Sequence, residues 1–375
     1  MKVCIFVRIL WPGGVQRIAF AEAEQLIVRG HSVDLVFLRD TGREKFKTVV
    51  PYKILFEPSV QNRLFGKILR IITHRYAPQR GPDATVDLDL MRRFERTRDE
   101  YDIVIYFDQH AAFFAEYGQK LHGGKFLVQI HETSLKEKAL LPHFIERRAL
   151  RSAAGIITNS LKNRSILQNH SYKDVSVIYP GLYSHPESPG FKWRYDIAIS
   201  TTVWDSGRHP EAFISIAKYL KTGRIVLAGS WADPGDLKKF SRLVEREKLT
   251  DKIVVTGPLS ENSLNDYYMR CKVGIRFGYN EAGPGMGSLE VISYGIPLLI
   301  NSGIGAIEVL ENGVNTIIVS EDRPDEVALV IERFFTDEDF WTSFHNSNIE
   351  LAQNMSWHNH GEALAMALND LSTSH

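Results

Sequence analysis

A glycine-rich stretch, residues 278–290, holds residue types that suit the binding of a phosphorylated ligand. The apolar run 273–277 before it predicts a buried strand, and residues 289–294 after it predict the first turns of a helix. Four glycines and a proline lie in the connection. In such a loop the backbone N–H groups can close on an anion, and the helix dipole adds partial positive charge at the same place.

Two carboxylates, Glu281 and Glu290, frame this loop. A carboxylate repels phosphate, but it accepts hydrogen bonds well from hydroxyl groups such as those of a ribose or a sugar. A loop that can bind an anion, with a hydroxyl-binding carboxylate on each side, indicates a nucleotide-sugar ligand. The loop by itself is equally compatible with a plain strand–turn–helix connection that needs glycine for its backbone angles.

Length and composition narrow the classes of function. The chain has 375 residues, which suits two domains, and its formal net charge is zero, so no overall field recruits nucleic acid or a membrane. Cys4 and Cys271 lie in apolar runs without metal-ligand or disulfide spacing, which is typical of the reducing cytosol. No stretch is long and uncharged enough to span a bilayer, and no leader peptide is recognisable. We therefore expect a cytoplasmic protein.

The beginning of the chain predicts one parallel βαβ unit. A strand at residues 2–7 is followed by a helix at 15–29, whose apolar residues keep helical spacing, and by a strand at 31–37. Gly13 and Gly14 lie at the crossing from strand to helix. The full G-x-G-x-x-G pattern is missing at this crossing. The interpretation that the chain binds a nicotinamide dinucleotide therefore loses its main support.

The same alternation continues along the rest of the chain, and a Pro/Ser/Gly-rich segment at 184–190 reads as a linker between two α/β halves. Ligands bind beyond the carboxyl ends of strands in such sheets, so two halves predict a cleft between domains. Further strands are predicted at 52–56, 101–106, 125–130, 155–158 and 175–181, and then at 195–200, 224–227, 253–256, 273–277, 297–300 and 316–320.

Residues 62–75, NRLFGKILRIITHR, predict a basic amphipathic helix. Such a helix can rest on an anionic membrane surface, which would place the protein peripherally at the cytoplasmic face of a membrane. An ordinary helix that packs its apolar stripe on the sheet explains the pattern as well.

Several sequence motifs follow one another along nearly the whole chain, and their order is the feature that matters. The first half holds PGGVQRIAFAEAEQLIVRGHSVDLV, then FLVQIHETS, then AAGIITNSLKNRSIL followed by VSVIYPGLY. The second half holds IVLAGSW, IVVTGPLSENSLNDYYMRCKVGI, the glycine-rich loop and GIPLLINSGIGAIEVLENGVNTIIV, with Ser356-Trp357 before a last helix at 362–371. This ordered set resembles the retaining GT-B glycosyltransferases of the family 4 type, also called glycosyl transferases group 1.

The resemblance implies an α/β GT-B fold in which two Rossmann-like doubly wound domains face each other across a cleft. The N-terminal acceptor-side domain would comprise residues 1–185, the C-terminal nucleotide-sugar-binding domain 186–355, and a helix at 356–375 would cross back to the first domain. The implied reaction is transfer of a sugar from a nucleotide-sugar donor to a glycan or lipid-linked acceptor by front-face displacement, with retention. Enzymes of this kind usually need no bound metal, so the resemblance implies no metal and no other cofactor.

The resemblance also assigns roles to the glycine-rich loop. Glu290 matches the second glutamate of the family's pair and would accept hydrogen bonds from the ribose hydroxyls. Glu281 matches the first glutamate and would hold the hydroxyls of the donor sugar, although eight residues separate the pair here and seven are usual in the family. The diphosphate would receive backbone N–H groups of Gly285, Met286, Gly287 and Ser288.

Gly13 and Gly14 would approach the same diphosphate from the opposite domain, where the missing side chains admit a close backbone; a plain tight turn is the alternative. His131 ends a strand towards the implied cleft and would contact the donor sugar or its phosphate; otherwise it serves only as a strand-end cap. Asn159 and Ser160 are explained by helix capping.

Arg208 occupies the place of the family's phosphate-binding lysine and would stabilise charge on the leaving group. The second cation that the family carries upstream is missing, because Thr201, Thr202 and Val203 stand there. Arg276 or Arg17 would replace it, or the site is weaker. That departure and the longer loop keep two other functions open: a non-catalytic nucleotide-sugar-binding or scaffold protein, and a GT-B-related nucleotide-sugar epimerase.

Overall fold

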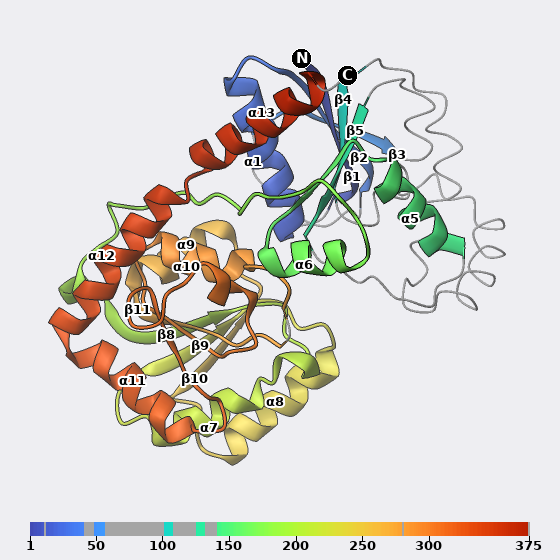
Figure 1. The fold of residues 1–375 in the computed structure, drawn as a ribbon. Coiled ribbons are helices and arrows are strands. Elements are labelled where there is room, and N and C mark those ends of the chain that lie inside the picture. Colours follow the sequence, from blue (N-terminus) through green and yellow to red (C-terminus); the bar gives the residue numbers. More distant parts are fainter. Residues whose placement is uncertain are drawn as a thin grey trace. The chain divides into compact units, whose positions relative to one another are not determined.

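The computed structural model describes residues 1–10, 13–40, 49–56, 101–107, 125–131, 141–279 and 281–373. The chain divides into two compact units, whose elements are labelled in Figure 1. Unit 1 comprises Met1–Pro180 together with Trp357–His375, and unit 2 comprises Gly181–Ser356. The basic segment 62–75 lies outside the described residues.

Unit 1 contains a parallel sheet with the strand order β3-β2-β1-β4-β5-β6-β7 among the described residues. β1 pairs with β2 on one side and with β4 on the other, so the direction of winding reverses between β1 and β4. The strands are β1 (Lys2–Leu10), β2 (Ser32–Asp40), β3 (Tyr52–Phe56), β4 (Ile103–Phe107), β5 (Lys125–Ile130), β6 (Gly155–Thr158) and β7 (Val175–Val177).

The described helices of unit 1 include one that returns from the far end of the chain. They are α1 (Gly14–Val28), α5 (Leu141–Ser152), α6 (Leu161–Asn169) and α13 (Trp357–Thr373). α13 packs closely on α1, since a Cβ at Gly361 would lie only 2.7 Å from the Cβ of Gln25. Arg29, after α1, donates to the carbonyl oxygen of His358 at 2.7 Å. The C-terminal helix is therefore an integral part of unit 1.

Unit 2 contains a second parallel sheet, with the order β10-β9-β8-β11-β12-β13. Its winding reverses between β8 and β11, which pair directly. The strands are β8 (Tyr195–Thr201), β9 (Arg224–Ala228), β10 (Ile253–Gly257), β11 (Cys271–Arg276), β12 (Leu298–Ile300) and β13 (Thr316–Ile318), and the helices are α7 (Glu211–Tyr219), α8 (Pro234–Arg246), α9 (Glu261–Arg270), α10 (Met286–Ser293), α11 (Pro324–Thr336) and α12 (Glu338–Asn354).

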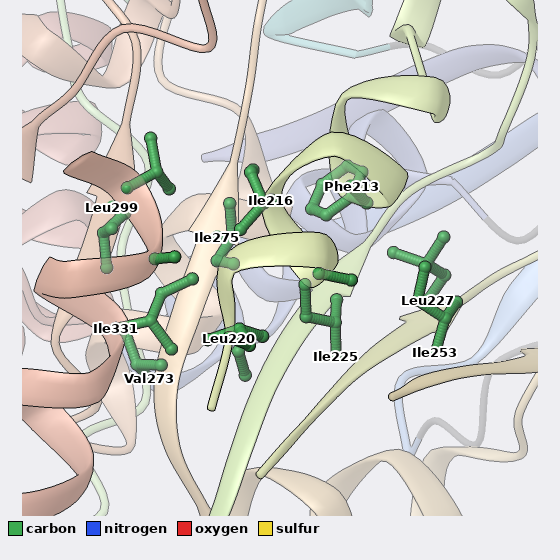
Figure 2. Close-up of a cluster of buried hydrophobic side chains, with 14 of the residues drawn as sticks. Phe213, Ile216, Leu220, Ile225, Leu227, Ile253, Val273, Ile275, Leu299 and Ile331 are labelled. Atoms are coloured by element: carbon green, nitrogen blue, oxygen red, sulfur yellow. The ribbon is translucent and has the colours of Figure 1, made fainter. Parts of the chain in front are cut away.

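Both faces of the second sheet are buried, and successive strand residues alternate between two cores. Figure 2 shows part of one core, where α7 and α11 cover strand residues such as Ile225, Leu227 and Leu299. The neighbouring Val226 and Leu298 belong to the other core, beneath α9 and α10. This burial on both faces explains why these strands read as almost unbroken apolar runs. The structure thus confirms the predicted α/β class with two Rossmann-like doubly wound domains.

Several element boundaries differ from the sequence prediction, and three of them concern β1, α10 and α13. β1 continues to Leu10, because its pairing with β2 extends to Leu10 and Asp40. α10 begins at Met286 and α13 at Trp357, several residues before the predicted starts at 289 and 362. The first turns of both helices contain glycine or polar residues of low helix propensity, and packing of the following apolar residues outweighs that preference.

A buried arginine, Arg194, fixes the segment before β8 to the ends of α9 and α10. Only 4% of its surface is exposed. Burial lowers the pKa of Arg194 to about 10, so the guanidinium remains charged at neutral pH. Its hydrogen bonds go to the carbonyl oxygens of Pro189, Tyr268, Cys271 and Tyr294 and to the hydroxyl of Ser188.

Replacement of this arginine tests how far unit 2 depends on it. We expect Arg194→Met to lower the free energy of unfolding by on the order of 4 kcal/mol, because several buried carbonyl groups lose their donors at about 1–3 kcal/mol each. Urea unfolding followed by tryptophan fluorescence measures the change. Arg246→Met is the matched control, since the Arg246 side chain is 74% exposed, and it should change stability by less than about 0.5 kcal/mol. Equal effects of the two substitutions would show that Arg194 has no such role.

Candidate active site

The strand order of unit 2 places one candidate site at the carboxyl ends of β8 and β11. Ligands of doubly wound sheets bind where the winding reverses, outside the carboxyl ends of the strands. In unit 2 this point lies between Thr201, the last residue of β8, and Arg276, the last residue of β11. The loop that follows β11 leads directly into α10.

Close backbone packing explains some glycines of the loop but not Gly285. A Cβ at Gly278 would lie 2.8 Å from Cδ of Glu281, and one at Gly303 would lie 2.3 Å from the carbonyl oxygen of Gly278. A Cβ at Gly285 would meet nothing nearer than Oε2 of Glu281 at 3.9 Å. Its backbone angles, φ −70° and ψ 136°, are open to any residue. Neither packing nor conformation demands a glycine at position 285.

The N-terminus of α10 lies open next to β8. Its N-cap residue is Gly285, which has no side chain to cap the helix. In unit 2, Asp233, Ser260 and Asp337 cap α8, α9 and α12 through side-chain hydrogen bonds, whereas the N-cap residues of α7 and α11 make none. A Cβ at Gly287 would lie 3.4 Å from the carbonyl oxygen of Thr201. The first turn of α10, with its partial positive charge, is thus held against the end of β8, and its N-cap residue supplies no carboxylate or hydroxyl.

Three charged side chains meet beside this helix end. Oε1 of Glu281 lies 2.5 Å from Nη1 of Arg208 and 3.1 Å from Nη2 of Arg276. The side chains of Glu281 and Arg276 are only 15% and 12% exposed, and that of Arg208 is 30% exposed. Two guanidinium groups therefore share one carboxylate oxygen and leave a local excess of positive charge.

Burial lowers the pKa of Arg276 from its ordinary value, and the nearby positive charge of Arg208 acts in the same direction. The carboxylate of Glu281 opposes both effects. The two arginines are thus close enough to repel each other, and Glu281 is the group that holds them together. A multivalent anion in this position would relieve the same repulsion.

Polar and aromatic groups surround the cluster. The hydroxyl oxygens of Thr201 and Tyr268 lie 3.1 Å apart at the end of β8. The rings of His209 and Tyr279 lie 4.5 Å apart, and the Tyr279 hydroxyl donates a hydrogen bond to Glu321. The sequence prediction did not single out Thr201 or Tyr268, because Tyr268 lies on the apolar face of α9 and gives the signal of a core residue.

The structure brings most of the predicted site residues together in unit 2. Glu281 lies in the loop, Arg208 follows β8, and Gly285 precedes the first turn of α10, which Met286, Gly287 and Ser288 form. Ser288 is fully buried. Glu290 lies one turn further along α10 and is half-buried, and its carbonyl oxygen accepts from Ser293.

Gly13, Gly14 and His131 belong to unit 1. Gly13 is the N-cap of α1, extended at φ −140° and ψ 165°, and makes no side-chain capping bond; Gly14 is the first helical residue. His131 directly follows β5, with its ring 5.4 Å from that of Phe107. Burial, reinforced by the positive charge of His360, lowers the pKa of His131 to about 3, so its imidazole is neutral at physiological pH.

Two further predictions concern unit 1. Ser160 caps α6 by accepting from the backbone N–H of Asn163 at 3.0 Å, as predicted. Asn159 instead accepts from the side-chain amide of Asn163 at 2.9 Å, which is not a capping bond. Arg17, the alternative second cation, lies on α1. Of the two alternatives, Arg276 is the one that shares Glu281 with Arg208.

Within the described residues, no group of three or more His, Cys, Asp or Glu side chains could hold a metal ion. None of the described helices is both long and apolar enough to cross a membrane.

Comparison with protein families gives two matches in succession. Residues 12–183 match Glycosyltransferase Family 4, and residues 209–355 match Glycosyl transferases group 1. No curated protein sequence matches the chain.

Solved structures of the same fold cover almost the whole chain. HepE from Anabaena in complex with UDP has a TM-score of 0.72 at 13% identity and covers 99% of this chain and 100% of its own. Sucrose-phosphate synthase from Thermosynechococcus elongatus has a TM-score of 0.72 at 14% identity, with 99% of both chains covered. The catalytic domain of starch synthase IV from Arabidopsis thaliana, bound to ADP and acarbose, has a TM-score of 0.70 at 11% identity, with 100% of both covered. With the two family matches in order along it, the chain belongs to the GT-B glycosyltransferases of the family 4 type.

Proposed function

We propose that this glycosyltransferase moves a sugar from a nucleoside diphosphate sugar to a glycan or lipid-linked acceptor, with retention of the anomeric configuration. The observation that carries the proposal is the pair of guanidinium groups, Arg208 and Arg276, beside the uncapped N-terminus of α10. A diphosphate matches both features, since it is multivalent and gains from backbone N–H groups at a helix start. HepE, with the same fold, has been solved with UDP and with UDP-glucose.

The donor diphosphate would lie between the two arginines and the first turn of α10. Gly285, Met286, Gly287 and Ser288 supply the backbone of this turn. The space above Gly285, which packing leaves open, admits the ligand. Glu290, one turn further along the helix, would accept hydrogen bonds from the ribose hydroxyls.

Glu281 would serve two purposes in the same site. Its Oε1 holds Arg208 and Arg276 together. Its Oε2 lies 3.9 Å from the position that a Cβ at Gly285 would take. From this position the carboxylate would accept hydrogen bonds from the donor-sugar hydroxyls while it keeps the arginines in place.

Unit 1 would supply the remaining contacts to the donor. Gly13 and Gly14, at the uncapped start of α1, would offer their backbone to the diphosphate. His131, neutral at physiological pH, would exchange hydrogen bonds with the donor sugar and would not add charge.

The proposed mechanism is a front-face displacement. The acceptor hydroxyl attacks the anomeric carbon from the side of the leaving group, and its proton passes to an oxygen of the departing diphosphate. The enzyme contributes positioning and charge stabilisation, because the diphosphate gains negative charge as the glycosidic bond breaks. Neither a side-chain nucleophile nor a metal or other cofactor is needed in this scheme. We further propose that the enzyme works in the cytoplasm, with residues 62–75 as a peripheral membrane contact.

The substrate class is tested with a panel of nucleoside diphosphate sugars. We expect one donor to raise the melting temperature and to be consumed only when a glycan or lipid acceptor extract is present, with the product anomer matching the donor by NMR. An inverted product would contradict retention. Donor binding without turnover over the whole panel, or interconversion of the donor alone, would contradict transfer.

The paired arginines give a sharper prediction. Arg276→Gln should lower kcat by about a hundredfold with a smaller effect on donor affinity, because charge on the leaving diphosphate is greatest in the transition state. Arg208→Gln should behave alike, and the double variant should lose less than the product of the two effects, since both groups act on one ligand. Arg270→Gln, an exposed arginine paired with Asp266, is the control. An unchanged kcat for Arg276→Gln would show that a group other than Arg276 stabilises the charge on the leaving diphosphate.

Glu290 is tested by removing its charge while keeping its shape. Glu290→Gln should weaken donor binding by about tenfold to a hundredfold, the value of hydrogen bonds to a charged acceptor at about 1.5–3 kcal/mol. Isothermal titration calorimetry with the donor, and with the free nucleoside diphosphate, measures it. The same loss for both ligands supports a ribose contact, whereas a loss restricted to the intact donor would point to the sugar instead.

A substitution at Gly285 tests the proposed space for the ligand separately from the stability of the fold. Gly285→Ala should change the free energy of unfolding by less than about 1 kcal/mol, because alanine fits the backbone and only the N-cap preference is lost. Donor affinity should fall at least tenfold, since the methyl group enters the proposed diphosphate space. Gly278→Ala is the contrasting variant, because its Cβ clashes with Glu281 and should destabilise unit 2 itself. Full donor affinity in Gly285→Ala would contradict this placement.

A further inference from the structure

Unit 1 buries a carboxylate and an imidazole that the proposed chemistry does not use. Glu22, on α1, is fully buried, and His360, on α13, is 5% exposed. Oε1 of Glu22 lies 2.9 Å from Nε2 of His360. The same oxygen accepts a hydrogen bond at 2.6 Å from the side-chain amide of Gln129, on β5.

The hydrogen-bond geometry requires an extra proton on this pair. Nδ1 of His360 lies 2.7 Å from the carbonyl oxygen of Tyr179, which can only accept, so Nδ1 carries a hydrogen. Nε2 faces the carboxylate of Glu22, and one proton must lie between them, on either the nitrogen or the oxygen. Loss of that proton to solvent would leave a nitrogen lone pair against a buried carboxylate, which is costly away from water.

The other ionisable groups around the pair do not replace that proton. Arg29, at the end of α1, lowers the pKa of His360 through its charge, as burial does, whereas the hydrogen bonds and charge of Glu22 raise it; the net direction is upward. His131, beyond β5, is held neutral by burial and by the charge of His360. Exposed His358, on α13, pairs with Glu362 at 3.2 Å.

The pair connects three elements that are distant in sequence. Glu22 belongs to α1, His360 to α13, and Gln129 to β5, two residues before His131 on the same side of the strand. Oε2 of Glu22, Oε1 of Gln129 and both ring nitrogens of His131 are buried and have no hydrogen-bond partner among the described residues. The Glu22 carboxylate thus ties the Gln129 side chain to α1 and α13. The backbone at the carboxyl end of β5 is also held by pairing with β6 and by a hydrogen bond from the Asn163 side-chain amide to the carbonyl oxygen of His131.

We propose that Glu22 and His360 form a positioning pair, which locks α13 onto unit 1 and steadies Gln129 and the nearby His131 at the carboxyl end of β5 while the pair retains its shared proton. The lock itself is independent of the proposed function. Its effect on sugar transfer rests on that function, because it acts through the proposed donor contact of His131.

The sign of the pH dependence follows from the raised pKa of His360. The stabilisation is fully present below the unfolded-state pKa of about 6.5, and it is lost as the pH rises from there through the folded-state pKa. One proton is released on opening within this window, so the opening constant of α13 should rise by up to about tenfold per pH unit.

Hydrogen exchange of the wild-type protein tests the lock without any activity measurement. Protection factors of backbone amides in peptides from α13 and β5, corrected for intrinsic exchange, are measured between about pH 5.5 and 9, a range that brackets the ordinary histidine pKa, by mass spectrometry. We expect constant protection at the acid end and a coordinated decline in both elements above that pKa. Flat protection in α13 across the range would overturn the proposal, as would an NMR titration in which His360 loses its proton below the ordinary value.

Glu22→Gln is the sharpest variant because it keeps the shape and removes the proton requirement. The amide nitrogen that this substitution introduces can donate to Nε2 of neutral His360 and, after a flip of the Gln129 amide, to Oε1 of Gln129. Protection in α13 should then be independent of pH above about 6.5, where the histidine is neutral in the unfolded state as well. His358→Gln, on the exposed face of the same helix, should keep the wild-type pH dependence. A pH-dependent decline that persists in Glu22→Gln would assign the effect to another group.

The activity arm uses the donor found by the thermal-shift panel. The wild-type kcat should decline over the same pH window as α13 protection, with KM nearly constant, and Glu22→Gln should lack that decline. If exchange behaves as expected but no transfer occurs with any donor, the lock stands and the proposed function fails. If transfer occurs with a kcat that is insensitive to the pair, the positioning of His131 is refuted.

Discussion

The candidate site depends on one carboxylate that holds two like-charged groups together. Arg208 and Arg276 come from different strand ends, and the repulsion between them must be offset before either can serve a ligand. Glu281 meets both through a single oxygen and is largely shielded from water. In the proposed site, Arg276 on the neighbouring strand takes the place of the second cation that the family resemblance implies upstream of Arg208. The topology makes this exchange possible, because β8 and β11 are adjacent where the winding reverses.

The rigidity that this arrangement needs comes from the two cores of unit 2. Strand residues alternate between them, so each strand end is fixed from both sides. Arg194 adds a polar anchor at the opposite end of α10, where it bonds the carbonyl oxygen of Tyr294. α10 is therefore held at its C-terminal end and left uncapped at its N-terminal end. The structural anchor and the proposed ligand contact thus lie at different ends of the same short helix.

Much of the fold could be predicted from the sequence, because strands buried on both faces appear as apolar runs and parallel pairing demands helical crossovers. The start of α10 could not, since Gly287 and Ser288 disfavour a helix in isolation and only tertiary packing extends it. In the sequence, Arg276 has the pattern of a polar residue at the end of a strand. It meets Arg208 at Glu281 only because β8 and β11 are neighbours in the sheet, and the local sequence does not reveal that order. The contact between Glu22 and His360 spans 338 positions, and no local pattern announces such a pair.

The return of α13 to unit 1 also imposes an order on biosynthesis. α13 leaves the ribosome only after all of unit 2 has been made, so unit 1 waits without its last helix while the later domain is completed. During this interval Gln25 and the carboxylate of Glu22 on α1 lack the contacts with α13 that they have in the finished protein. The nascent N-terminal half is thus an incomplete domain, open to chaperones and proteases until a distant segment arrives to close it.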